Sequence, residues 1–236
     1  MRKILCEQCG IRGSSIVSDL TDAELNDFRA CSVTAIYRRR QVIFHERTPA
    51  SGLYVLCHGA VKLYQSDRFG RDHILGLAGP GDVLGELPTD PSESYSVSAE
   101  AVTDAQLCFL GRDRLVPFIQ AHPMVGVRLI SALSRALSSA RRKVRTLALK
   151  NAEGRLAELL LQLASANGCN GDPVHVPLPY SRREIGEMIG VSTETAIRLL
   201  AGLKHKRVVE FGRQELVLVD SDRLRRLANQ ESIENP

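Results

Sequence analysis

The stretch Ser181-Arg-Arg-Glu-Ile-Gly-Glu-Met-Ile-Gly-Val-Ser-Thr-Glu-Thr-Ala-Ile-Arg-Leu-Leu200 carries the clearest structural signal in this chain. Ser181 followed by Glu184 is a capping box, which predicts that a helix begins there. A glycine ends that helix, and Ser192 can cap a second helix that runs to about Lys206. A short helix, a tight turn and a second helix are typical of a helix-turn-helix.

The second helix separates apolar from polar side chains. Glu194 and Arg198 lie one turn apart, so both can point into a major groove, where Arg donates twice to guanine and Glu accepts from the cytosine amino group. The alternative is an ordinary ion pair on a solvated helix. At 100° per residue the apolar face holds Ala196, Leu199, Leu200 and Leu203, and the opposite face holds Glu194, Ile197, Arg198 and Ala201.

The flanking sequence supports this interpretation. The apolar spacing of residues 152–166 predicts a helix, and a loop punctuated by three prolines follows it. After the second helix, residues 208–211 and 215–219 predict a hairpin-like pair of strands, separated by a turn at Gly212.

A long basic helix precedes this region. No acidic residue occurs between Asp113 and Glu153, and apolar residues recur there at alternating steps of three and four. Such a pattern fits a helix buried in one domain, or a dimerisation helix between two domains, which we favour. Since no acid interrupts the apolar seam, we expect a dimer even without a ligand. The seam residues are Val125, Leu129, Ala132, Leu133, Ala136, Leu137, Ala140, Val144 and Leu147.

Residues 33–112 consist of short apolar or alternating runs separated by turns. Strands are predicted at 52–59, 60–65, 73–77, 97–101 and 105–110. Several short strands at this spacing predict a sandwich or barrel-like β domain.

Composition narrows the function classes. The chain has 236 residues, a net charge of +4 and 44% hydrophobic residues, as an ordinary globular protein of one or two domains does. No apolar run approaches the ~20 residues of a membrane span, and the N-terminal apolar run is too short for a signal peptide. We therefore expect a cytoplasmic protein without a membrane partner. The sequence has no P-loop, G-x-S-x-G or H-E-x-x-H motif, so we expect no enzyme.

Three blocks in this order resemble the CRP/FNR family of bacterial transcription regulators along nearly the whole chain. They are Gly52-Leu-Tyr-Val-Leu-Cys-His-Gly-Ala-Val-Lys-Leu-Tyr64, Pro80-Gly-Asp-Val-Leu-Gly-Glu86 and Gly190-Val-Ser-Thr-Glu-Thr-Ala-Ile-Arg-Leu-Leu200. A further stretch, Lys150-Asn-Ala-Glu-Gly-Arg-Leu-Ala157, is similar to the FNR branch in particular.

The resemblance implies an α+β fold with four parts. These are a cysteine-containing arm over residues 1–20, a β-roll sensor of the cyclic-nucleotide-binding jelly-roll type over 21–113, a dimerisation helix over 114–149 and a winged helix-turn-helix over 150–236. It also implies a homodimer on a palindromic site in double-stranded promoter DNA, with RNA polymerase as a further partner. A pure interaction module would leave the second domain unexplained.

The same resemblance assigns the reading of a half-site to Glu194 and Arg198. Ile197 stands where the family has Ser or Gly; it cannot donate a hydrogen bond but can pack against a thymine methyl group. The remaining candidates for DNA binding, most of them for its phosphates, are Arg182, Ser192, Thr193, Thr195, Lys204 and Lys206.

A cyclic nucleotide is the first signal to consider for the sensor. Glu86 matches the family's ribose-binding acid. The position of the family's phosphate-binding arginine, however, corresponds to a place near Glu93 in this chain. Between Arg71 and Arg112 the sequence has no Lys or Arg, and an anion beside carboxylates is disfavoured. We therefore expect no cyclic nucleotide.

An iron–sulfur cluster is the second candidate. Cys6-Glu-Gln-Cys9 is a C-x-x-C pair of the kind that holds such clusters. By resemblance, Cys108 matches the family's distant ligand of a [4Fe–4S] cluster, but Ser15 stands where its remaining cysteine should be. Cys31 is our candidate for the fourth thiolate, and Ser15 or a small molecule is the alternative.

Three other interpretations of the sensor remain open. The arm can be a relic whose thiols bind nothing, which leaves a constitutive regulator, or its cysteines can sense oxidants without metal. The interpretation as a haem sensor depends on isolated residues, and such residues are more often structural than ligands. They are His45, His58, His73 and Cys57. Cys57 and Cys169 show no partner in the sequence.

Overall fold

The computed structural model describes residues 15–18, 20–88, 90, 92–166, 168, 173–212 and 215–230. Contacts divide the chain into two compact units. The first comprises Met1–Ser66 with Leu75–Ser138, and the second comprises Asp67–Ile74 with Ser139–Pro236.

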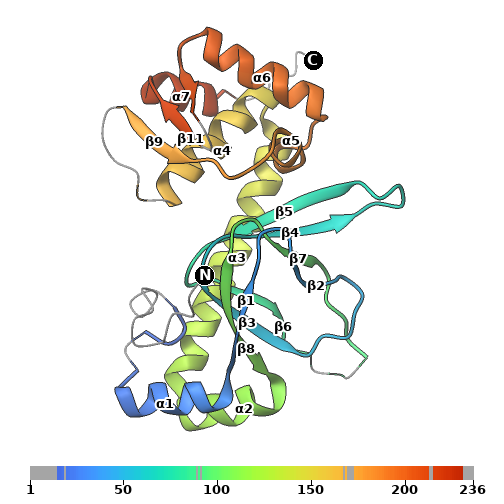
Figure 1. The fold of residues 1–236 in the computed structure, drawn as a ribbon, viewed down its shortest axis with the longest axis vertical. Helices are drawn as coiled ribbons and strands as arrows, with labels where there is room; N and C mark the ends of the chain where they lie inside the picture. The colour runs from blue at the N-terminus through green and yellow to red at the C-terminus, as the bar shows by residue number, and fades with distance from the viewer. Residues whose placement is uncertain are drawn as a thin grey trace. The chain divides into compact units, whose positions relative to one another are not determined.

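Two four-stranded antiparallel sheets form the β-roll (Figure 1), which confirms the predicted jelly-roll class. The strand orders are β1-β8-β3-β6 and β2-β7-β4-β5. The sequence pattern did not single out β1, β2 and β6. The strands are β1 (Val33–Tyr37), β2 (Val42–Phe44), β3 (Gly52–His58), β4 (Val61–Ser66), β5 (Asp72–Ala78), β6 (Val83–Glu86), β7 (Ser98–Ala101) and β8 (Ala105–Gly111).

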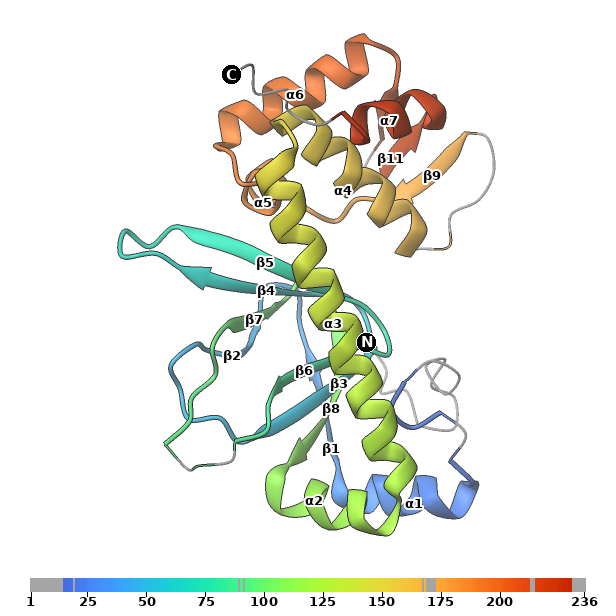
Figure 2. The same cartoon turned by 180° about the vertical axis from the view of Figure 1, so that it is seen from behind.

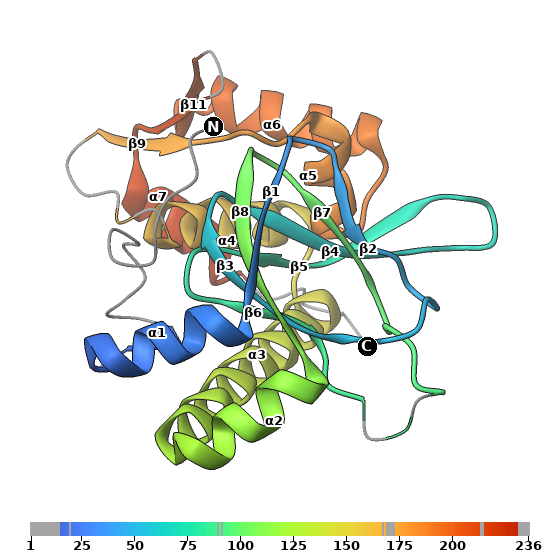
Figure 3. The ribbon, with the colours of Figure 1, turned by 60° about the horizontal axis from the view of Figure 1, so that its bottom comes forward.

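The sheet that contains β3 and β8 is buried on both faces. Because side chains alternate along a strand, Leu56 and Leu107 face one apolar cluster, inside the roll. Val55 and Cys108 face the other cluster, which also contains Phe118. This second cluster is built with helices α1 (Asp22–Cys31), α2 (Arg112–Ala121) and the start of α3 (Pro123–Leu149). Figure 3 shows these helices beside the strands.

The range expected as one dimerisation helix contains two helices. Here α2 ends at Ala121, and α3 begins at Pro123. His122, between them, has φ −128° and ψ 72°, because a residue before proline is pushed away from helical angles. No single described helix is long and apolar enough to span a bilayer; only the bent α2–α3 pair, taken together, meets that test.

The second unit is a helical domain with a small sheet, as the winged helix-turn-helix prediction requires. Figure 2 shows α4 with α7 beside it. The sheet has the order β10-β11-β9. The predicted helix over 152–166 and the hairpin are confirmed, whereas β9 and α7 were not predicted. The elements are α4 (Ala152–Ala166), β9 (Val174–Pro177), α5 (Arg182–Ile189), α6 (Thr193–His205), β10 (Val209–Phe211), β11 (Glu215–Leu218) and α7 (Ser221–Ala228).

Candidate nucleic-acid interface and sensor thiols

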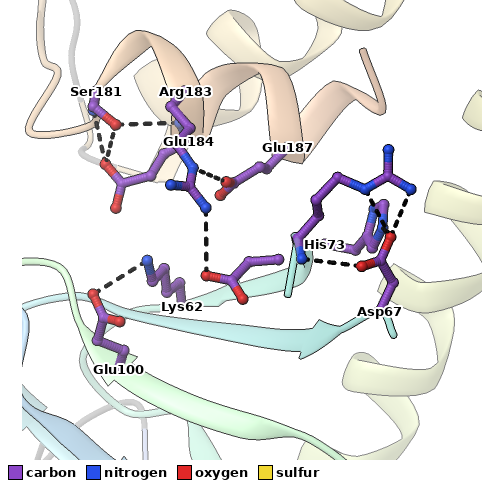
Figure 4. A network of polar contacts seen from close by, with 10 residues as sticks. Lys62, Asp67, His73, Glu100, Ser181, Arg183, Glu184 and Glu187 are labelled. Carbon is purple, nitrogen blue, oxygen red and sulfur yellow. Dashed lines mark hydrogen bonds and ion pairs between the residues drawn. The ribbon is translucent and has the colours of Figure 1, made fainter. Parts of the chain in front are cut away.

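Both ends of α5 are capped as the sequence predicts. The Ser181 hydroxyl accepts a bond from the Glu184 amide at 3.2 Å, and the Glu184 carboxylate accepts one from the Ser181 amide at 2.8 Å (Figure 4). At the other end Gly190 has φ 69°, a left-handed conformation that glycine adopts without strain. These caps set the angle at which the chain enters α6.

The turn between the helices depends on a close approach at Gly186. The Val191 amide donates to the Gly186 carbonyl at 2.9 Å. A Cβ atom added at Gly186 would lie 2.9 Å from the Val191 carbonyl oxygen and 3.5 Å from the Ala196 Cβ. The helix-turn-helix geometry therefore needs glycine here.

We expect Gly186→Ala to lower the free energy of unfolding by about 1–3 kcal/mol, since the new methyl group overpacks against backbone. Gly202→Ala in α6 is the matched control, because nothing lies within 4 Å of the added Cβ, and it should stabilise by up to about 1 kcal/mol. Urea unfolding followed by circular dichroism measures both. Equal unfolding midpoints for the two variants would contradict the close-approach argument.

Helix α6 buries one face and exposes the other, as predicted. Ala196, Leu200 and Leu203 are at most 2% exposed, whereas Leu199 is half-buried. Glu194 and Arg198 are exposed, as is Ile197 at 51%. An apolar residue so exposed is free to contact a binding partner, and the packed rear face fixes the helix that carries Glu194 and Arg198.

The Glu194 carboxyl is held in its charged form. A hydrogen bond from its own backbone amide, followed by one from Ser192, lowers its pKa below the usual 4.5. Ser192 also caps α6, since its hydroxyl accepts the Thr195 amide at 3.2 Å. An ionised carboxylate only accepts hydrogen bonds, which suits contact with a cytosine amino group.

The predicted phosphate-binding cations occupy different environments. The Arg182 guanidinium stacks over the Phe211 ring at 4.4 Å, and burial lowers its pKa. The Lys206 ammonium lies 2.6 Å from the Glu153 carboxylate of α4. Lys204 is exposed. DNA binding by these residues, and by Thr193, stays a prediction.

Arg155 supports the helix-turn-helix from behind and was not predicted. Its Nε atom donates to the Ile189 carbonyl at 2.7 Å, and one terminal nitrogen donates to the Lys150 carbonyl at 3.0 Å. It therefore ties the end of α5 to the start of α4. The sequence signal that could have identified Arg155 is its place in the Lys150–Ala157 block.

Helix α3 carries an exposed apolar stripe, which we call the α3 stripe. Its large members are 44–67% exposed, and they repeat at steps of three and four with Ala140 between them, which is the spacing of a coiled-coil seam. Three predicted seam residues differ, because Val125 and Leu129 are buried in the core of their own unit and Ala132 packs against it. Ala136 is exposed as expected, and Ile130 joins the stripe although the sequence pattern did not include it. The α3 stripe consists of Ile130, Leu133, Leu137, Ala140, Val144 and Leu147.

Aromatic rings occupy the interior of the β-roll. Tyr95 stacks on Phe44 with ring centroids 4.3 Å apart, and Tyr54 also stacks on Phe44 at 5.4 Å. The Tyr95 hydroxyl donates to the Gly52 carbonyl at 3.3 Å. Burial raises the pKa of Tyr54 and Tyr37, so these phenols stay neutral and bring no charge to a bound anion.

Charged groups near this interior are paired within the protein. Glu86 accepts hydrogen bonds from both the amide and the hydroxyl of Ser96. Lys62 is buried beside Glu100 at 3.1 Å (Figure 4). It alternates with Val61 and Leu63, which face the apolar cluster, so it lies on the opposite face of the sheet.

The described cysteines gather at the cluster behind β3 and β8. The sulfur atoms of Cys57 and Cys108 are 3.4 Å apart, a contact that the sequence pattern did not indicate. Cys31 packs against the same cluster; its thiol donates to the Phe28 carbonyl at 3.2 Å, and burial raises its pKa. Among the described residues no three metal-binding side chains form a group. Cys6, Cys9 and Cys169 lie outside these residues.

Ser15, the other candidate for a ligand position, is buried at the start of the described chain. Its hydroxyl accepts a hydrogen bond from the Val17 amide at 3.3 Å. The next residues, Ile16, Val17 and Leu20, pack into the same cluster as Cys57 and Cys108. The described end of the arm is therefore part of the same apolar cluster as the two thiols.

Both parts of the chain match known families. A model described as a cyclic nucleotide-binding domain matches residues 35–122, and one described as a Crp-like helix-turn-helix domain matches residues 154–227.

Similar proteins cover most of the chain. A CRP-like cAMP-activated global transcriptional regulator of Mycobacterium tuberculosis is 31% identical over 194 residues, covering 81% of this chain and 86% of that protein. The nitrogen fixation regulation protein FixK of Bradyrhizobium diazoefficiens is 29% identical over 227 residues, covering 94% and 93%. The solved structure of FixK2 from Bradyrhizobium japonicum has a TM-score of 0.74 at 30% identity, covering 84% of this chain and 98% of that chain.

Proposed function

This chain belongs to the CRP/FNR family of transcription regulators, and we propose that it works as a homodimer that binds a palindromic promoter site in response to a redox or oxygen signal. It is a sequence-specific DNA-binding regulator, like its relatives, which are regulators and not enzymes. The helix-turn-helix reads the DNA, and the β-roll with its thiols supplies the control.

The exposed pair on α6 is the observation that carries the DNA-reading proposal. Glu194 and Arg198 project from a helix whose rear face is fully packed, and Glu194 is held ionised. Arg198 would donate to the two acceptors of a guanine, and Glu194 would accept from a cytosine. Ile197 between them would contact a thymine methyl group. The half-site therefore has a G·C-containing core.

The α3 stripe supports dimer formation by a second copy of the chain. An apolar heptad stripe on an exposed helix is stable in water only when a partner covers it. Ala140 in its middle lets two helices approach closely. A symmetric dimer presents two copies of α6 to half-sites about one DNA turn apart. RNA polymerase bound at the same promoter would be the next partner, in the cytoplasm.

The thiols support a sensor in which thiolates bind a metal. The family resemblance indicates that the metal would be held as an iron–sulfur cluster. Cys6, Cys9 and Cys108 would be ligands, and Cys31 is the sequence candidate for the fourth position. When bound, such a cluster supplies a centre whose oxidation state responds to oxygen or redox potential. Thiol oxidation without metal is the second candidate, favoured by the 3.4 Å separation of two cysteine sulfurs.

Cyclic-nucleotide control has less support in this chain. Stacked aromatic rings lie in the interior of the roll, and Glu86 accepts a hydrogen bond from the Ser96 amide. A cyclic phosphate would need a cation, but the sequence has no Lys or Arg between Arg71 and Arg112. We therefore keep the prediction that this regulator needs no cyclic nucleotide.

Gel-shift titration with anaerobically purified protein tests the function. We expect a sequence-dependent shift with palindromic duplexes whose half-sites lie one helical turn apart, and a weaker one when either half-site is scrambled. The same preparation should contain iron and sulfide, and exposure to air should change its DNA affinity. Equal binding to all duplexes would refute sequence-specific readout, and iron-free protein with intact DNA binding would refute the cluster.

A further inference from the structure

We propose that Glu158 is a positioning residue for DNA binding, because it fixes the angle between the last turns of α3 and α4 and thereby sets the distance between the two copies of α6. Glu158 lies on α4, outside the helix-turn-helix. The inference deepens the proposed function and rests on it, since it requires a homodimer on a palindromic site. The sequence pattern did not single out this residue.

The junction between α3 and α4 is short. Helix α3 ends at Leu149 and α4 begins at Ala152, so only Lys150 and Asn151 connect them. Asn151 caps α4, because its side-chain oxygen accepts a hydrogen bond from the Gly154 amide at 2.8 Å. The part of α3 after residue 138 belongs to the same compact unit as α4 and the helix-turn-helix. The angle at this junction therefore decides how that unit presents α6 relative to the end of α3.

One carboxylate spans this junction, and Figure 2 shows α4 folding back after the end of α3. Glu158 Oε2 accepts a hydrogen bond from the Thr146 hydroxyl at 2.9 Å and lies 2.8 Å from the Lys150 ammonium. Its other oxygen, Oε1, accepts one from Gln162 Nε2 at 3.3 Å, one turn further along α4. These contacts, which we call the Glu158 bridge, join the last turn of α3 and the connection to α4.

The Glu158 bridge is built to hold an angle. The side chains of Lys150 and Glu158 are 18% and 21% exposed, so their attraction is screened less than that of a fully exposed pair. Thr146 is half-buried, and a β-branched side chain has little rotational freedom. Because three side chains hold one carboxylate, the junction resists bending and twisting more than a single ion pair would allow.

Two further contacts transmit the angle to the helix-turn-helix. The Arg155 guanidinium donates to the carbonyls of Lys150 and Ile189, so it links the connection to the end of α5. A Cβ atom added at Gly190 would lie 3.5 Å from the Leu147 side chain, so the turn before α6 packs against the last turn of α3. The helix-turn-helix therefore moves together with the end of α3 while the Glu158 bridge is intact.

In the proposed dimer this rigidity sets the spacing of half-sites. Each base pair added between two half-sites separates them by about 3.4 Å and rotates them by about 35°. A rigid junction presents both copies of α6 at one spacing only. Without the Glu158 bridge the junction samples several angles, so the cost of ordering it is paid when DNA binds. Affinity for the correct spacing then falls, while other spacings are tolerated better.

Gel-shift titration of the full-length protein with three palindromes tests the inference. Their half-sites lie one helical turn apart, or one base pair closer or farther, and wild type should prefer the first. Glu158→Ala should weaken binding to the first palindrome roughly 10-fold and leave binding to the other two within about 2-fold. Glu158→Gln keeps an acceptor for Thr146 and loses the charge pair, so it should show a smaller loss.

A control on the same helix and a charge-swapped pair complete the test. Glu153→Ala removes another α4 carboxylate that pairs with a lysine, Lys206 at 2.6 Å, and it should keep the wild-type ratio of affinities for the three palindromes. Lys150→Glu combined with Glu158→Lys should recover part of the lost discrimination. Circular dichroism and light scattering check that each variant is a folded dimer, and nearly isosteric Glu158→Gln provides a second test if Glu158→Ala is unstable.

The outcomes separate this inference from the proposed function. If the Glu158 variants are folded dimers and discriminate the three spacings as wild type does, the inference is overturned and sequence-specific binding to a palindrome stands. An equal loss of discrimination in Glu153→Ala also overturns it, because any ion pair of α4 would then suffice. If wild type binds all three palindromes and their scrambled versions alike, the proposed function fails as well.

Discussion

Replacing Leu133 and Leu137 by glutamate should convert the dimer into a folded monomer and weaken binding to the palindromic site on the order of 100-fold or more, because each half-site is then bound separately. Both side chains are more than half exposed in one chain, so the charges cost the monomer little. In the dimer, four carboxylates would be buried in an apolar seam without partners. Size-exclusion chromatography with light scattering should give 26.0 kDa for the variant and about twice that for metal-free wild type.

A double variant on the same helix controls for added charge. Ser131 and Ser138 are exposed on α3 and lie outside the α3 stripe, at the same position of successive heptads, which does not face the seam. Ser131→Glu with Ser138→Glu should therefore remain a dimer with only a modest loss of DNA affinity from repulsion of phosphates. A dimer in the Leu133/Leu137 variant, or a monomer in this control, would show that the α3 stripe is not the dimer contact.

Arg198→Ala should weaken binding to the palindromic site roughly 30-fold to 10⁴-fold, because each lost bidentate contact to guanine costs about 1–3 kcal/mol and the dimer has two. The fold should be unaffected, since Arg198 is exposed. The loss should be confined to the specific site, and binding to unrelated duplexes should change little. Gel-shift titration against both kinds of duplex at fixed salt measures this difference.

Two controls distinguish base reading from charge. Arg198→Lys keeps the charge but lacks the planar fork of the guanidinium, so it should bind the palindrome less tightly than wild type does. Arg226→Ala removes an exposed arginine from α7 and should leave the ratio of specific to non-specific affinity unchanged. If Arg198→Lys binds the palindrome as tightly as wild type, Arg198 contacts phosphate and the readout assignment fails.

Elements with strong local signals were predictable. The capping box at Ser181, the Ser192 cap and the apolar period of α6 depend on residues within a few positions of one another, and all three are confirmed. The prolines around β9 predict a loop, but pairing with β11 makes this segment a strand. Helix α7 begins after Asp220, whose side chain caps it. This cap is a local signal of the same kind, so α7 could also have been predicted from the sequence.

The apolar face of α3 shows where local patterns stop being informative. Val125, Leu129, Leu133 and Leu137 share one apolar period, and the sequence offers no way to divide it. In the structure the first two are covered by the core of the unit that contains the β-roll, while the other two stay exposed. The difference comes from α1 and α2, which pack against only the first turns of α3.

The sequence by itself determined the family, the order of the β-roll and the helix-turn-helix, and the exposed face of α6, because these depend on short blocks and helical periods. Only the tertiary structure decided which cysteines meet. Cys57 and Cys108 are 51 positions apart, and no spacing rule joins them. They meet because antiparallel pairing sets Val55 opposite Cys108, and Cys57, two residues further along β3, faces the same apolar cluster as Val55. Strand register is a long-range property of the folded sheet, so it cannot be read from either strand alone.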